Sequence, residues 1–143
     1  MTVSRILSTK GRAVFTVEPE QTIGMVAQIL SSKGIGAAVV SRGAGDVVGI
    51  ISERDIVHAI ARTGAAALLE TVDRHMTEKV ITAQEKTTLE SLMQTMTSGR
   101  FRHVPVVENG SLCGLVSIGD VVKLRLEEFE LEQRALKDYI ATA

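Results

Sequence analysis

Hydrophobic residues recur with helical spacing once in each half of the chain. In the first half, positions i, i+3, i+4 and i+7 are held by Ile23, Val26, Ala27 and Leu30. In the second half, the same spacing is held by Leu89, Leu92, Met93 and Met96. Thr22 is suited to cap the first helix, and Thr87 with Glu90 has capping-box spacing before the second. Gly34 and Gly99 are suited to end the two helices. We therefore predict two matching amphipathic helices.

Each predicted helix is followed by a short apolar run, at residues 37–40 and 104–107. Glycine-containing turns at 42–46 and 108–111 predict that the chain returns as a hairpin, with second strands at 47–52 and 112–117. With an initial strand and a final helix, each half therefore follows the order βαββα. This order predicts an α/β fold of the α+β kind.

The two halves also share a motif. Residues 49–55 (GIISERD) recur 65 positions later as 114–120 (GLVSIGD), each reading glycine, three strand positions ending in serine, two variable positions and aspartate. A fixed internal period defines a structural unit. The predicted domains are 1–71 (first repeat with the N-terminal segment), 72–126 (second repeat) and 127–143 (C-terminal helical extension).

The helix predicted after Asp120 is much longer than its counterpart after Asp55. Its apolar positions follow a heptad seam that is interrupted only by Gln133, namely Val122, Leu126, Phe129, Leu136 and Ile140. Such a seam needs a partner. Packing against its own domain is one alternative, and we favour contact with a second copy in a homodimer.

Composition narrows the function classes. The formal net charge is −1 and aromatic residues make up 3%, which disfavours binding of nucleic acid or anionic membranes. The single Cys113 fits a reducing compartment, and no signal peptide or membrane-length apolar run is present, so we expect a cytoplasmic protein. His58 and His75 lack metal-ligand spacing, and no metal site is predicted.

The repeated Ser-x-x-Asp motif carries the candidate chemistry. A carboxylate at a helix start can accept hydrogen bonds from both hydroxyls of a ribose, and the helix N-terminus favours phosphate. Helix capping alone is the alternative explanation for Asp55 and Asp120. The cations Arg100, Arg102 and His103 precede the second-half strand. We expect them to clamp phosphate beside Asp120, the alternative being a solvated basic edge.

Two βαββα units that each end in glycine, apolar residues and Ser-x-x-Asp resemble a pair of CBS domains, named after cystathionine β-synthase. Such a tandem pair is called a Bateman module, and the resemblance implies that its two repeats pack sheet against sheet as a pseudo-twofold pair. The strings at 50–55 and 100–107 and the tail at 136–140 are similar to small stand-alone bacterial CBS-pair proteins. The resemblance spans about residues 12–126. It implies regulatory, non-catalytic binding of an adenine nucleotide, with AMP first and NAD(H), ADP or ATP as alternatives.

The resemblance also implies which residues bind. Each cleft borrows the segment that leads into the opposite repeat, so that Lys10, Gly11 and Arg12 join the Asp120 cleft and Thr77, Lys79 and Val80 join the Asp55 cleft. Arg54 is expected to reach a phosphate in the Asp55 cleft. The remaining expected binding residues are Ile35, Gly36, Ser52, Ser117, Ile118 and Gly119.

The expected function is therefore an adenine-nucleotide sensor that regulates an unidentified protein partner and has no enzymatic activity. One alternative is an assembly dimer with vestigial clefts. Another is an enzyme acting on nucleotides, although the sequence holds no P-loop or Ser-His-Asp elbow.

Overall fold

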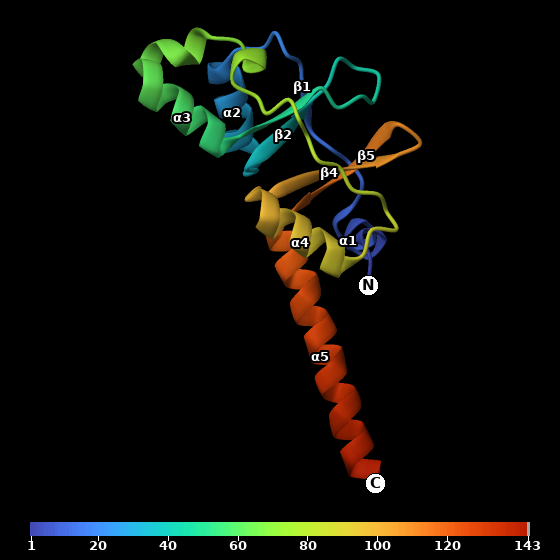
Figure 1. Cartoon of the computed structure of the whole chain (residues 1–143). Coiled ribbons are helices and arrows are strands. Elements are labelled where there is room, and N and C mark those ends of the chain that lie inside the picture. Colours follow the sequence, from blue (N-terminus) through green and yellow to red (C-terminus); the bar gives the residue numbers. More distant parts are fainter. Residues whose placement is uncertain (143) are drawn as a thin grey trace.

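The computed structural model describes residues 1–142 and contains two halves of similar architecture (Figure 1). The first half contains β1 (Thr16–Val17), α2 (Ile23–Lys33), β2 (Ala37–Val40), β3 (Gly49–Ser52) and α3 (Glu53–Thr63). The second half contains α4 (Leu89–Gly99), β4 (His103–Glu108), β5 (Ser111–Ser117) and α5 (Ile118–Thr142). The remaining elements are α1 (Val3–Lys10) and the 3-10 helices η1 (Gly64–Leu69) and η2 (Val72–Arg74). Residue 143, the end of the predicted extension, lies outside the described residues.

The strands of each half form a separate small sheet. In the first sheet β1 is parallel to β2, and β2 is antiparallel to β3. In the second sheet β4 and β5 form an antiparallel hairpin whose turn residues, Asn109 and Gly110, both have positive φ. Ala83 makes a single parallel bridge to Val106, as Val17 pairs with Val40 66 positions earlier. The second half therefore follows the same order, with its first strand reduced to one bridge.

The helix caps follow the sequence with two corrections. Thr22 caps α2 as predicted, because its Oγ1 accepts a hydrogen bond from the backbone N of Met25. In the second half the cap is Thr88, one residue after the predicted Thr87. Helix α4 also continues through Gly99 and ends at Arg100, which adopts φ 56° in the left-handed region. The predicted capping box and glycine stop of this helix were therefore wrong by one residue each.

Each half has its own aliphatic core. The first core joins the inner faces of α2 and α3 to the first sheet, through Val17, Ile23, Val26, Leu30, Ala38, Val40, Ile51, Ile56 and Val72. The second core has the equivalent residues of α4, β4, β5 and α5. It also takes Val3, Ile6 and Leu7 from α1, an N-terminal helix that we had not predicted. Although α1 comes first in the chain, it packs with the second half. The domain boundaries at 71/72 and 126/127 stay a prediction.

Helix α3 and the segments around it complete the first half. Val57 of α3 is 62% exposed, and the buried face of that helix is formed by Ile56 and Ala59. The connector after α3 is the 3-10 helix η1. Strand β3 begins at Gly49, two residues after the predicted start, because a turn held by Asp46 precedes it. The Asp46 carboxylate accepts hydrogen bonds from Ser41 Oγ and the Arg42 backbone N.

Helix α5 begins inside the second half and then leaves the body of the molecule (Figure 1). Val121 and Leu124 are buried in the second core. Ion pairs from Arg5 to Glu127 and from the N-terminal amino group to Glu128 tie the helix to the N-terminal segment. None of the helices in the described part of the chain is long and apolar enough to cross a membrane.

Candidate functional site

A pocket of about 360 Å³ lies at the junction of the two halves. It is lined by the start of α3, the linker after η2 and the segment between α4 and β4. The lining residues are Gly36, Ile50, Ser52, Glu53, Arg54, Asp55, Thr77, Lys79, Val80, Ile81, Gly99, Arg100, Phe101, Arg102 and His103. We call it the Asp55 pocket. Neither half alone forms it, because the linker crosses from one half to the other at this point.

Backbone hydrogen bonds fix the walls of the Asp55 pocket. Ile50 and Thr77 exchange N–H···O bonds of 3.0 and 2.9 Å, which hold the linker against the end of β3. The Glu53 backbone N donates to the Gly36 carbonyl, and the Ile118 backbone N donates in the same way to the Arg102 carbonyl. Both repeated Ser-x-x-Asp motifs therefore have the same backbone support, in keeping with the internal period.

Asp55 stands at the start of α3, and its carboxylate has one side engaged. Oδ2 accepts hydrogen bonds from the Ser52 backbone N (2.9 Å) and from Ser52 Oγ (3.0 Å). Ser52 Oγ in turn accepts a bond from the Asp55 backbone N, which completes a capping box. No bond from another described residue is made to Oδ1. Capping and ligand binding are therefore compatible at this aspartate.

Four cationic side chains face the Asp55 pocket, from Arg54, Lys79, Arg100 and Arg102. The carboxylates of Glu53 and Asp55 are the acidic groups in the lining. Within residues 1–142, none of the four cations belongs to an ion pair. A locally positive cavity in a chain of net charge −1 favours an anionic ligand at this site.

The pocket also has apolar and neutral walls. Ile50, Val80, Ile81 and Phe101 supply the apolar surface that a flat heterocycle needs. The ring of His103 lies beside Gly36, where an added Cβ would meet its Cε1 and Nε2 at 3.5 Å. Burial first, and Lys10 second, lower the pKa of His103, so its imidazole is neutral at pH 7. His103 can therefore donate or accept a hydrogen bond there but adds no charge.

The surroundings of Asp120, the equivalent aspartate of the second repeat, are arranged differently. Its Ser117 bonds match those of Ser52, but Oδ2 of Asp120 also accepts a 2.6 Å bond from Lys10 Nζ. Lys10 Nζ donates in addition to the Leu115 carbonyl, which corresponds by the repeat to Ile50. Burial raises the pKa of Asp120, but the bonds from Lys10 and Ser117 outweigh it, so the net shift is downward. This carboxylate already has a cation from its own chain.

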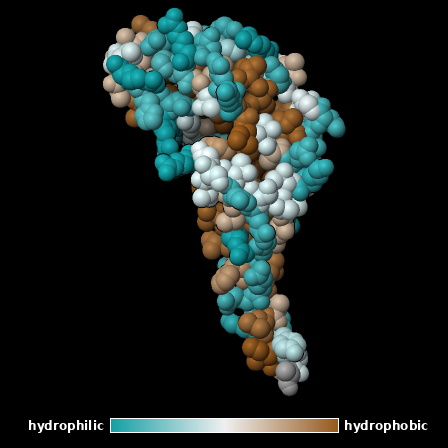
Figure 2. Space-filling view, viewed as in Figure 1, coloured by the Kyte–Doolittle hydropathy of each residue, from teal (hydrophilic) through white to brown (hydrophobic). Residues whose placement is uncertain are grey.

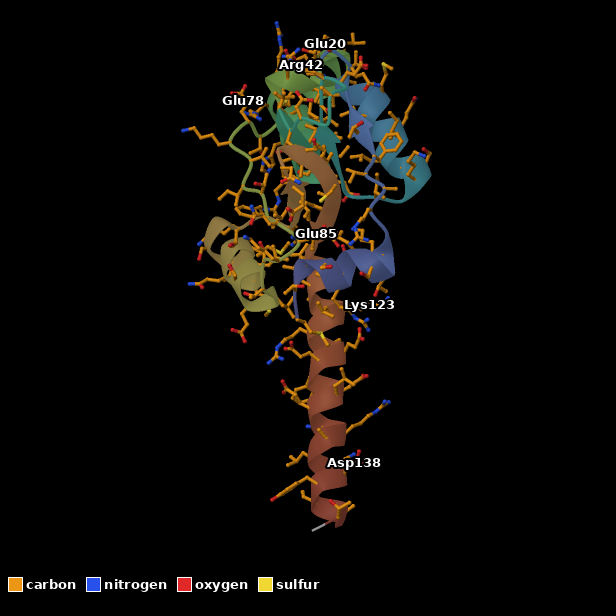
Figure 3. The ribbon with its side chains drawn as sticks, turned by 90° about the vertical axis from the view of Figure 1, so that its right-hand side faces the viewer. Glu20, Arg42, Glu78, Glu85, Lys123 and Asp138 are labelled. Carbon is orange, nitrogen blue, oxygen red and sulfur yellow. The ribbon has the colours of Figure 1, made fainter. Side chains whose placement is uncertain are left out.

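Arg12, the second cation expected at the Asp120 cleft, is also paired. Its Nε and Nη2 both contact Glu85 Oε1, the former at 3.0 Å. Figure 3 labels Glu85 in the middle of the body, near α1. Arg12 lines a separate hollow of about 240 Å³ with Val14, Thr16, Ser41, Gly43, Gly45 and Leu112. That hollow contains neither aspartate of the repeated motif.

These positions differ from one sequence-based expectation. We had placed Arg100, Arg102 and His103 beside Asp120 as a phosphate clamp, but all three line the Asp55 pocket. The reason is that segments of one repeat lie against the other repeat. The segment after α4 belongs to the second repeat in sequence, yet its side chains reach over to the first repeat's α3.

The structure brings together ten of the expected binding residues, in the Asp55 pocket: Gly36, Ser52, Arg54, Asp55, Thr77, Lys79, Val80, Arg100, Arg102 and His103. It does not place the others there, namely Lys10, Gly11, Arg12, Ile35, Ser117, Ile118, Gly119 and Asp120. Sequence reasoning missed Ile50, Glu53, Ile81, Gly99 and Phe101. Glu53, Ile81, Gly99 and Phe101 each adjoin an expected binding residue, and Ile50 lies two positions before Ser52. This closeness in sequence is the signal that could have identified them.

Comparison with known families decides the classification. The model of the CBS domain matches residues 3–62 and 70–127, which together make up most of the chain. The chain belongs to the CBS-domain family. The two matched segments form a tandem pair, a Bateman module, and a long C-terminal helix follows them.

Solved structures of CBS proteins agree. A CBS-domain containing protein from Agrobacterium tumefaciens is 50% identical, with a TM-score of 0.85 over 87% of this chain and 99% of that chain. A protein with CBS domains from Burkholderia ambifaria, described as a candidate in signal transduction, is 34% identical, with a TM-score of 0.83 over 89% and 95% of the two chains. These matches confirm the expected CBS-pair fold.

A further CBS pair has been solved with ligands. The pair of protein MJ0100, in complex with 5′-methylthioadenosine and S-adenosyl-L-methionine, is 28% identical to this chain. Its TM-score is 0.78 over 87% of this chain and 98% of that chain. A homologous CBS pair therefore binds adenosyl ligands.

Proposed function

We propose that this CBS pair is a regulatory module without catalytic activity that binds an adenine nucleotide in the Asp55 pocket. The observation that carries the proposal is the joining of an Asp55 carboxylate, an apolar wall and four cations without ion pairs in one cavity. A nucleotide needs the same three features, for its ribose, its base and its phosphate. The adenosyl ligands bound by the MJ0100 pair support an adenosine-based ligand.

Among adenine nucleotides we favour AMP. The cavity of about 360 Å³ is at the small end of the range for ligand pockets, which favours a mononucleotide over a dinucleotide such as NAD(H). ADP and ATP would place further phosphates among the same cations. A titration with adenosine, AMP, ADP, ATP and NADH ranks these ligands directly.

We further propose that the module acts as a homodimer and passes its occupancy to a separate regulated protein. Binding can transmit a signal only where the ligand stabilises one arrangement of the module more than another. The pocket is suited to this because both halves and their linker supply its lining, so a ligand would contact all three.

A pair of matched variants tests the site. Asp55→Ala and Asp120→Ala each remove a carboxylate that caps a helix and bonds to a serine, and Asp120→Ala also removes the ion pair with Lys10. Because Asp55 loses charge-assisted bonds to ribose, about 2–3 kcal/mol, AMP affinity should fall about 30- to 150-fold. Asp120→Ala should leave it within about twofold. Calorimetry that finds equal losses in both variants would contradict the assignment to the Asp55 pocket.

The assembly alternative makes a different prediction. A ligand at about 100 times its Kd stabilises the native state by about 2.7 kcal/mol, which for a chain of this length raises the melting temperature by about 5–10 °C. No shift with any adenine nucleotide would favour a dimeric scaffold with vestigial clefts. That alternative draws support from the ion pair at Asp120 and from the projecting α5.

A further inference from the structure

Helix α5 has an apolar face, over residues 122–140, that residues 1–142 leave largely exposed. The seam residues Val122, Leu126, Phe129, Leu136 and Ile140 are 52, 59, 51, 59 and 65% exposed. Figure 2 shows hydrophobic surface alternating with hydrophilic surface along this projecting helix. Packing against its own domain, the alternative considered for the seam, is therefore not observed. The buried residues of α5 are instead Val121 and Leu124, on another face.

The exposed residues form an unbroken heptad series. Val122, Phe129 and Leu136 take the d positions, and Leu126, Gln133 and Ile140 take the a positions. Figure 3 labels Lys123 where the helix leaves the body and Asp138 near its tip, so the series follows most of the projecting length. The same positions bring two helices together in a two-stranded coiled coil.

The charges beside the seam indicate which way a partner helix runs. The g positions carry Arg125, Glu132 and Tyr139, and the e positions carry Lys123, Glu130 and Lys137. In a parallel pair, each g residue faces the e residue five positions later on the partner. Arg125 then meets Glu130 of the second copy, and Glu132 meets Lys137. Both pairs are attractive, and each occurs twice in the dimer because of its two-fold symmetry.

The antiparallel arrangement lacks this complementarity. When the a and d layers of two antiparallel copies interlock, the heptad centres them near Leu131 and brings e against e and g against g. Glu130 then faces Glu130, Glu132 faces Glu132, and Lys123 faces Lys137 of the other copy. All three contacts are between like charges, which disfavours this orientation.

We propose that α5 pairs with α5 of a second copy of this chain as a parallel, in-register coiled coil over residues 122–140. Gln133 supplies the polar layer, where the two amides face each other and can hydrogen-bond only in register. Arg125 also pairs with Glu128 of its own helix at 2.6 Å, and this contact must loosen or be shared when the partner's Glu130 approaches. The observations that support this pairing do not include any ligand in the Asp55 pocket.

The helix length explains why the whole chain is needed. Nineteen residues extend about 28 Å and make fewer than three heptads, which is marginal for an isolated helix in water. The ion pairs of Arg5 and of the N-terminal amino group with Glu127 and Glu128 fix the base of the helix and pre-order its first turns. The experiments therefore use the full chain.

A matched pair of substitutions tests the seam. Leu136 lies at a d position and Leu131 lies on the opposite face at f, and both are exposed, at 59 and 49%. Leu136→Asp should convert the dimer to a monomer in light scattering, whereas Leu131→Asp should remain dimeric. Neither side chain packs in either core, so neither substitution should lower the melting temperature of the two CBS repeats themselves. A monomeric wild-type chain at micromolar concentration, or a dimer that survives Leu136→Asp, would overturn the proposal.

Charge exchange tests the orientation. Arg125→Glu with Glu132→Lys reverses the g charges, and Glu130→Lys with Lys137→Glu reverses the e charges. Each double variant should lose its homodimer, because its parallel g–e pairs become repulsive, and mixing the two should restore a heterodimer. In an antiparallel pair, the central Glu130 and Glu132 contacts would stay like-charged in either variant. Retained homodimers of both double variants would therefore rule out the parallel arrangement.

Crosslinking gives an independent reading of register. Gln133→Cys, in a chain whose native Cys113 is changed to Ser, should form a disulfide between two copies under mild oxidation. In the antiparallel arrangement residue 133 faces Phe129 of the other copy, too far from its own equivalent for disulfide geometry. The control is Leu131→Cys in the same background. Equal crosslinking at 131 and 133 would overturn the in-register parallel pairing.

Discussion

Arg100 lines the Asp55 pocket although its own backbone conformation is strained. It caps α4 with φ 56°, a left-handed conformation that costs a non-glycine residue about 1–2 kcal/mol. The equivalent residue of the first repeat is Gly34, with φ 63°, which adopts this conformation without strain. Arg100 lines the Asp55 pocket, so strain is found where a ligand contact is expected.

Arg100→Gly should therefore separate stability from binding. Relief of the strain, partly offset by the greater freedom of glycine when unfolded, should raise the free energy of unfolding by up to about 1 kcal/mol. AMP affinity should fall at least about tenfold because a charge-assisted contact is lost. Urea unfolding and calorimetry measure the two effects. A variant that is both less stable and unchanged in affinity would show that the guanidinium supports the fold instead.

His103 makes the stability of the folded chain depend on pH, and the surroundings of its imidazole set the sign of this dependence. Burial lowers its pKa below the ordinary 6.5, with Lys10 and Arg102 acting in the same direction and Glu53 and Asp120 opposing. Between the lowered pKa and 6.5, the unfolded chain binds more protons than the folded chain. Stability therefore falls as the pH drops below about 6.5.

His103→Gln should remove this part of the pH dependence. From pH 7.5 to 5.5, the wild type should lose more stability than the variant, since glutamine does not titrate. Chemical unfolding at a series of pH values gives the difference between the two slopes. Identical slopes would mean that His103 becomes protonated equally well in the folded protein.

At the scale of elements, α1 makes the surroundings of Asp120 different from those of Asp55. It packs into the second core, and Lys10 at its end bonds to Asp120 and to the Leu115 carbonyl. In the first half, the corresponding carbonyl of Ile50 accepts its bond from the backbone N of Thr77. A side chain thus takes the place of a backbone strand contact and engages the second aspartate.

The wild type should accordingly bind one nucleotide per chain. Lys10→Met removes the cation from Asp120, and a second, weaker site should appear in the calorimetric stoichiometry. Because the cationic cluster lies in the other pocket, this second site should accept adenosine about as well as AMP. A stoichiometry of two in the wild type would show that Lys10 does not compete for the carboxylate.

Sequence periodicity predicted the elements well and their partners poorly. The two Ser-x-x-Asp motifs, the helices α2 and α4 and the hairpin strands follow from local spacing, capping and turn residues. The placement of α1, and the position of Arg100 and Arg102 beside Asp55, depend on which segments cross between the halves. A repeat defines equivalence within each unit but carries no information on that crossing. Local pattern therefore identified candidate residues but could not say which of them line the same pocket.

At the scale of the whole molecule, the pocket and the α5 seam are connected through one backbone bond. The first residue of α5, Ile118, donates its N–H to the carbonyl of Arg102, which lines the Asp55 pocket. A phosphate that holds Arg102 would restrain the start of the helix. Because the proposed coiled coil needs that helix in one orientation, we expect nucleotide binding to strengthen dimerisation.

Linkage makes this expectation quantitative in both directions. If AMP tightens the dimer by some factor, the dimer must bind AMP more tightly than the monomer by that factor, since coupling free energies are reciprocal. Typical couplings of about 1–3 kcal/mol correspond to about 5- to 150-fold. We therefore expect Leu136→Asp, far from the pocket along α5, to bind AMP more weakly than the matched Leu131→Asp control. Sedimentation with and without AMP gives the same factor from the other side. Equal AMP affinities in the two variants would mean that occupancy of the pocket leaves this helix pair unchanged, and the regulated partner would then have to read the body of the module directly.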